Sequence, residues 1–154
     1  MKTMKPFIIL SIGLTALLLS CQSEKTSLFK DLGAVKTEVS TVRQYVDDST
    51  FIDVDVTALA QDLASTHSEN RVDVDKVAKM KAALYRFYSH VNLVDGVYEC
   101  DLSSAAEIHV SSDVFNVLKT NLEDMNAAIA KAKKEGKEIH VSQIDQDYLN
   151  NLLK

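Results

Sequence analysis

Residues that break or cross-link a chain are scarce in this sequence. Its 154 residues include one proline, four glycines, two cysteines and no tryptophan. β-Sandwiches and barrels require many turns, which glycine and proline usually provide, so this composition favours helices. The two thiols, Cys21 and Cys100, form neither a disulfide framework nor the paired cysteines of a structural zinc site. Stability must therefore come from packing.

The motifs that commonly mark an enzyme are also missing. The sequence has no Gly-x-Ser-x-Gly elbow, no glycine-rich phosphate loop and no His-Glu-x-x-His helix. Its 22 acidic residues do not single out a carboxylate pair for glycoside hydrolysis. We therefore predict that the protein is not an enzyme and that it needs no cofactor.

Charge argues against nucleic acid as a partner. The 17 basic and 22 acidic residues give a formal net charge of −5. Residues 1–20 hold two of the basic residues and none of the acidic ones, so the chain without them carries −7. No cluster of basic and aromatic residues remains to follow a phosphate backbone. An acidic surface instead suits a basic protein partner.

The N-terminus has the pattern of an export signal. Lys2 and Lys5 precede an uncharged apolar stretch over residues 7–19, which Leu18-Leu19-Ser20-Cys21 closes. A cationic start, a short apolar region and a small residue before the cut describe a secretory signal, and the run is too short to span a bilayer. The last four residues resemble the lipobox of bacterial lipoproteins. This resemblance covers only the first two dozen residues and implies cleavage before Cys21 and lipidation of its thiol.

Such lipidation would anchor the chain to a membrane that it does not cross, because two or three acyl chains suffice for stable attachment. We therefore expect a signal peptide at 1–20, a lipidated tether at 21–26 and one domain at 27–154. Gln22 is similar to the residue that follows the cysteine in outer-membrane lipoproteins of proteobacteria. Some surface lipoproteins of the Bacteroidetes carry an acidic run there, which is reduced here to Glu24. The expected location is the cell envelope, in the outer membrane, facing the periplasm or the cell surface.

Apolar periodicity predicts a mainly α protein, a single bundle of three long and two short helices. A seven-residue repeat marks two long helices, over residues 28–46 and about 113–135. The third, from about 74 to 91, has an apolar face wide enough for the most enclosed place in the bundle. Short helices are expected at 57–66 and 143–153. The repeats consist of Leu28, Leu32, Val35, Val39, Val42 and Val46, and of Phe115, Leu118, Leu122, Met125, Ile129 and Ala132.

Four similar strings precede helical stretches and indicate helix starts. They span residues 52–55, 72–75, 108–111 and 139–142, and each has valine at its third position and Asp or Ser at its fourth. Asp and Ser accept hydrogen bonds from the exposed N–H groups of a first helical turn. We therefore expect the N-caps to be Asp55, Asp75, Ser111 and Ser142.

The connection over residues 92–106 is too long for an ordinary bundle turn. It contains Asp95-Gly96 between apolar residues, the pattern of a β-hairpin, so we expect a minor hairpin around 93–110. If residues 97–100, 107–110 and 138–141 pair, the fold becomes α+β. Long loops on a rigid scaffold often carry binding residues, and this segment is the first candidate for a functional surface.

The spacing of the aspartates does not fit a calcium loop. Counting from Asp53, the sixth and twelfth positions hold Ala58 and Ala64, where such a loop needs glycine and glutamate. In the pairs Asp53/Asp55 and Asp73/Asp75 we expect one member to cap a helix and the other to face water. The prediction is therefore that the protein has no metal site.

Histidines and tyrosines supply the remaining candidates for binding. His109 and His140 each lie between Ile and Val, and they would form a zinc or proton-transfer site only if the two extended pieces pair. Tyr85 and Tyr88 have hydroxyls that must reach water or a partner, which places them at the rim of a candidate pocket, and Tyr98 in the long loop is expected to line the same groove.

Taken with the expected anchor, these features favour a non-catalytic binding or accessory module for another envelope protein. One alternative is an immunity-type or inhibitor lipoprotein, whose acidic surface would attract a basic toxin delivered to the envelope. The other is a protein that binds a small ligand or a metal through His109 and His140.

Overall fold

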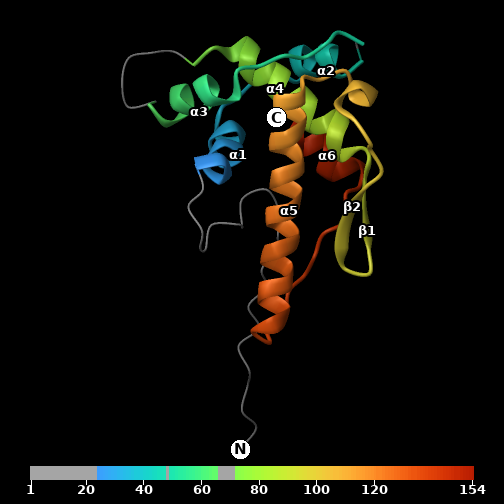
Figure 1. Ribbon diagram of the computed structural model, residues 1–154. Helices are drawn as coiled ribbons and strands as arrows, with labels where there is room; N and C mark the ends of the chain where they lie inside the picture. The colour runs from blue at the N-terminus through green and yellow to red at the C-terminus, as the bar shows by residue number, and fades with distance from the viewer. Residues whose placement is uncertain (1–23, 48, 66–71) are drawn as a thin grey trace, which may run out of the picture.

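Helices form most of the described chain, as the computed structural model shows for residues 24–47, 49–65 and 72–154 (Figure 1). The mainly α prediction with a minor hairpin is confirmed. In chain order the elements are α1 (Glu24–Ala34), α2 (Val39–Asp47), α3 (Val56–Ala64), α4 (Val74–Tyr88), β1 (Val91–Val94), β2 (Val97–Cys100), the 3-10 turn η1 (Ala105–Ile108), α5 (Ser112–Lys134) and α6 (Gln146–Leu152).

The larger sheet of the α+β alternative does not form in the described residues. Strand β2 pairs with β1, antiparallel, in a two-stranded sheet. Residues 107–110 contribute to η1 and to one parallel bridge, between Ile52 and Val110. The helix α1 begins at Glu24, three residues before the expected start of the domain.

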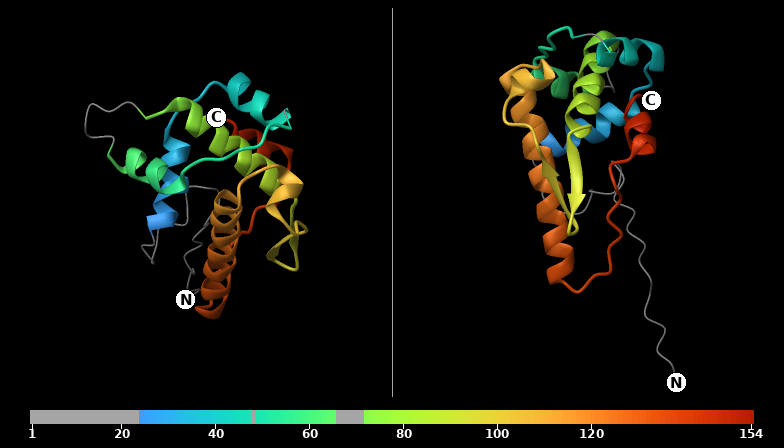
Figure 2. Two further views of the ribbon diagram at one scale, coloured as in Figure 1. Left: turned by 45° about the horizontal axis from the view of Figure 1, so that its top comes forward. Right: turned by 90° about the vertical axis from the view of Figure 1, so that its right-hand side faces the viewer.

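Helix α4 is the most enclosed helix, as its wide apolar face predicts. Its buried apolar residues are Val77, Ala78, Met80, Ala82, Ala83, Leu84, Phe87 and Tyr88. It packs against α2, α5 and α6, while α1 packs against α3. Helix α5, the longest, extends beyond the other helices with the hairpin beside it (Figures 1 and 2). Its predicted stripe is buried from Phe115 to Ile129.

The predicted continuous helix over residues 28–46 is wrong. The chain leaves the helix after Ala34 and resumes it at Val39, which yields α1 and α2. At the break, the Val35 carbonyl and the Thr37 hydroxyl accept hydrogen bonds from Lys81 Nζ on α4, at 2.7 and 3.1 Å. The hydrogen bonds from Lys81 take the place of helical hydrogen bonds at this break. The apolar repeat continues across the break and therefore does not indicate it.

Arg86 on α4 ties several segments to the core. Its guanidinium donates to the carbonyls of Thr50 at 3.1 Å, Ile108 at 3.0 Å and His109 at 3.4 Å, and also to the carbonyl of Tyr45. The residue is only 8% exposed. A buried guanidinium is tolerated when its donors are satisfied, and here they hold the end of α2 and the residues on either side of the 52–110 bridge.

Two of the four expected N-caps are confirmed. Asp55 accepts from the Ala58 N–H at 2.9 Å, and Ser111 accepts from that of Val114 at 3.4 Å. The other two predictions are wrong by two and three residues. Helix α4 is capped by Asp73, which accepts from the N–H groups of Asp75 and Lys76, and α6 is capped by Asp145, which accepts from that of Tyr148. Each capping residue directly precedes the first turn of its helix. The four similar sequence strings locate that position only to within a few residues.

Candidate functional site

The segment predicted to carry function is a tight β-hairpin. Val94 pairs with Val97 across a two-residue turn, in which Asp95 and Gly96 have φ angles of 51° and 76°. Positive φ at both positions is typical of the type I′ turn, whose twist matches that of the flanking strands. The Asp-Gly pattern therefore predicted this turn correctly.

Helix α5 holds the hairpin through polar contacts with its backbone. Asn126 Oδ1 accepts from the Tyr98 N–H at 2.9 Å, and Asn126 Nδ2 donates to the Tyr98 carbonyl at 2.8 Å. Near the turn, Lys133 Nζ donates to the Gly96 carbonyl at 3.3 Å. The amide of Asn126 thus satisfies both backbone groups of Tyr98 as a neighbouring strand would.

The two faces of the hairpin differ sharply. Val91 and Tyr98 are each 3% exposed and face the core, whereas Val94 and Val97, opposite one another in the register, are 43% and 42% exposed. Few large apolar side chains of the described residues are this exposed, and the others lie apart in sequence. The solvent-facing valine pair, Val94 and Val97, is the candidate binding surface.

The three tyrosines predicted for a pocket rim lie in different surroundings. Tyr85 is partly exposed, and its hydroxyl accepts from Gln146 Nε2 at 3.3 Å. Tyr88 is fully buried, with its hydroxyl accepting from Asn121 at 2.6 Å, and burial raises its pKa strongly. Tyr98 is buried too, and its hydroxyl donates to the Ser142 carbonyl at 2.6 Å. Tyr88 and Tyr98 therefore offer no phenol at the surface.

A fourth tyrosine, which the sequence does not single out, completes this interior cluster. The rings of Tyr88 and Tyr148 meet edge to face, with centroids 5.9 Å apart. The Tyr148 hydroxyl is buried without a hydrogen-bond partner among the described residues, and burial raises its pKa well above the usual value. This phenol lies between α4 and the hairpin side of the domain, in a position that costs stability.

The candidate metal ligands do not assemble in the part of the chain that the structure describes. His109 and His140 are both exposed, and no group of three or more potential ligands lies close enough to hold an ion. A third histidine, His90, belongs to a surface pair, in which its Nδ1 lies 3.0 Å from Asp101 Oδ1. Cys100 is half-buried, and burial raises its thiol pKa, which disfavours the reactive thiolate.

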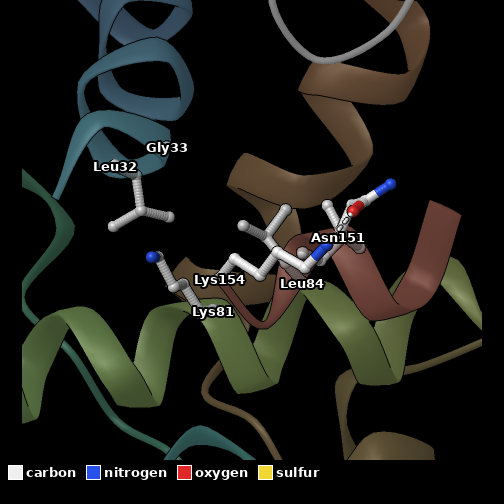
Figure 3. Close-up of a pocket in the computed structure, with 7 residues that line it drawn as sticks. Leu32, Gly33, Lys81, Leu84, Asn151 and Lys154 are labelled. Carbon is white, nitrogen blue, oxygen red and sulfur yellow. Dashed lines mark hydrogen bonds between the residues drawn. The ribbon is translucent and has the colours of Figure 1, made fainter. Parts of the chain in front are cut away.

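A small cavity lies between α1, α4 and α6 (Figure 3). Its volume is about 80 Å³. Lys81 extends from α4 into the space between α4 and α1. Lys154, which follows α6 in the sequence, lies on the α6 side of the cavity. The lining residues are Leu32, Gly33, Lys81, Leu84, Asn151, Leu152 and Lys154.

Sequence reasoning overlooked Lys81. The residue is 2% exposed, although lysine is seldom buried without a partner of opposite charge. Burial lowers the pKa of its ammonium group. A lysine and an arginine within the otherwise uncharged stretch 80–88 are the signal that would have identified both buried cations.

The lipobox and Cys21 lie outside the described residues. Within these residues, no helix combines the length and the apolar character needed to cross a bilayer. Comparisons with protein-family models, with curated proteins and with solved structures found no match for this chain.

Proposed function

We propose that this protein is a lipid-anchored module of the bacterial envelope, without catalytic activity, that presents its hairpin to another envelope protein. The observation that carries the proposal is the exposed Val94 and Val97 pair on a hairpin fixed to α5. Apolar side chains held in one geometry lose little conformational entropy on binding, which favours their use in an interface. The anchor is inferred from the residue pattern around Cys21.

The contacts behind the hairpin support this proposal. Asn126 and Lys133 bind its backbone on the α5 side, so the hairpin is held as a rigid platform. Because the amide of Asn126 already satisfies the Tyr98 N–H and carbonyl, a partner strand cannot add at that position of β2. A partner would instead contact the valine pair, which presents side chains and not unpaired backbone.

Site-specific photo-crosslinking in the producing cell tests the proposal. A photoreactive residue at Val97 should give one dominant adduct with an envelope protein, since the partner covers this side chain. The matched control carries the same photoreactive residue at Val74. This valine is 53% exposed and begins α4, outside the hairpin. The Val74 derivative should give no such adduct.

The anchor is checked in the same cells. Radiolabelled palmitate should enter the protein, and Cys21→Ser should lose both the label and most of the Val97 adduct, because the unanchored chain is no longer held beside its partner. Equal adducts from Val74 and Val97 would show that the hairpin is not the binding surface. An unlabelled wild-type protein would exclude the lipid anchor.

A further inference from the structure

The cavity between α1, α4 and α6 is lined by a buried cation, Lys81, that forms no ion pair with the residues the structure describes. Lys81 Nζ donates to two neutral acceptors, the Val35 carbonyl at 2.7 Å and the Thr37 hydroxyl at 3.1 Å. An ammonium group has three donors, so one N–H has no acceptor among the described residues. None of their carboxylates forms an ion pair with Lys81.

This arrangement is unfavourable unless something else supplies the charge. Buried ammonium groups are normally paired, because neutral acceptors recover only part of the hydration energy that is lost. The burial that lowers the pKa of Lys81 expresses the same cost. An anion in the adjoining cavity would meet the third N–H and balance the charge.

The walls and the size of the cavity restrict the kind of anion. Leu32, Leu84 and Leu152 line it, so the space favours an alkyl group beside the charge. An engineered apolar cavity of about 150 Å³ binds benzene, and about half that volume suits only a few heavy atoms. Asn151 and Lys154, at the exposed side of the cavity, are hydrogen bonded to each other at 2.7 Å. Phosphate or sulfate beside Lys81 would therefore leave most of its oxygens against leucine side chains.

We infer that this cavity binds a short-chain monocarboxylate of two to four carbons, with its carboxylate on Lys81 and its alkyl group against the leucines. The site lies on α1, α4 and α6 and shares no residue with the valine pair of the hairpin. Binding here is therefore independent of the proposed envelope partner, and each can fail without the other.

Titration calorimetry on the full-length protein in detergent tests this site, with propionate as the probe and propionamide as its neutral analogue. Propionate should bind, and propionamide should bind at least about tenfold more weakly, because the neutral amide cannot form a charge-assisted hydrogen bond with Lys81. Lys81→Met should weaken propionate binding by a similar factor. Lys76→Met is the matched control, since Lys76 is also on α4 but does not line the cavity, and its side chain is 42% exposed. It should retain binding within about threefold.

An NMR measurement on the wild-type protein tests the same inference without relying on variants that fail to fold. Nuclear Overhauser contacts should join the methyl group of propionate to the methyl groups of Leu84 and Leu152. Equal binding of propionamide would mean that the cavity is merely apolar. Equal binding by Lys81→Met, absence of contacts with these leucines or absence of propionate binding would each overturn the inference.

Discussion

The α4 side and the hairpin side of the domain differ in how their buried polar groups are hydrogen bonded. On α4, the side chains of Arg86 and Lys81 donate to backbone carbonyls of segments 22 to 46 residues away in the sequence. On the hairpin side, an amide from α5 serves one strand, and the Tyr148 hydroxyl has no partner among the described residues. The comparison predicts global destabilisation from damage at α4 and local loosening from damage at the hairpin.

The largest effect should follow the loss of Arg86. Arg86→Met keeps an unbranched side chain of similar length but leaves carbonyls from three segments without their donor. We expect the free energy of unfolding to fall by about 3–5 kcal/mol, because several carbonyls lose their donor and each unsatisfied one costs about 1–3 kcal/mol. Equilibrium urea unfolding measures this loss.

Arg43→Met provides the control for Arg86. Arg43 is exposed, and its described hydrogen bond is to Asn150 at 3.3 Å, so this variant should change stability by less than about 0.5 kcal/mol. Similar unfolding midpoints for the two variants would show that the carbonyl contacts of Arg86 contribute little.

A smaller, local effect is expected at Asn126. Asn126→Ala removes both hydrogen bonds to Tyr98, which should cost about 1–3 kcal/mol. Hydrogen exchange should become faster in β1 and β2 than in α4, because the strands lose their support while the helical core stays packed. The control is Asn116→Ala, whose side chain is exposed on the same helix. Uniform faster exchange throughout the domain would contradict the division into two regions.

The sequence predicted well the elements that turn preference and apolar periodicity determine. The Asp95-Gly96 turn and the stripe on α5 needed only turn preference and periodicity. The break between α1 and α2 could not be predicted in this way, since it depends on Lys81, which lies 46 residues from Val35. Local signals cannot show which distant donor will satisfy a carbonyl.

The candidate sites show the same limit. The segment that forms the hairpin was predicted to be a candidate functional surface from its length and its turn, but exposure of Val94 and burial of Tyr98 follow from its docking on α5. The cavity beside Lys81 has no contiguous motif, because its lining comes from α1, α4, α6 and the residue after them. Both candidate sites could be recognised only from the tertiary contacts that form them.

The smallest effect at neutral pH, and one of opposite sign, is expected from Tyr148→Phe. The variant removes a buried hydroxyl that lacks a partner, so the protein should become more stable by about 1 kcal/mol in urea unfolding. Tyr88→Phe is the control, because its hydroxyl is hydrogen bonded to Asn121 and its loss should destabilise. A loss of stability in Tyr148→Phe would indicate that this phenol is satisfied in solution.

Alkaline pH should enlarge the difference between wild type and Tyr148→Phe. Burial raises the folded-state pKa of Tyr148 above the ordinary value of 10.0, so the unfolded chain releases this proton first. The stability linked to the neutral phenol is therefore complete below pH 10 and declines above it, by up to about 1.4 kcal/mol per pH unit. Tyr148→Phe lacks this contribution, and its stability should fall less steeply above pH 10. Parallel slopes for the two proteins would mean that Tyr148 ionises equally easily in the folded and unfolded states, and hence that it is not buried.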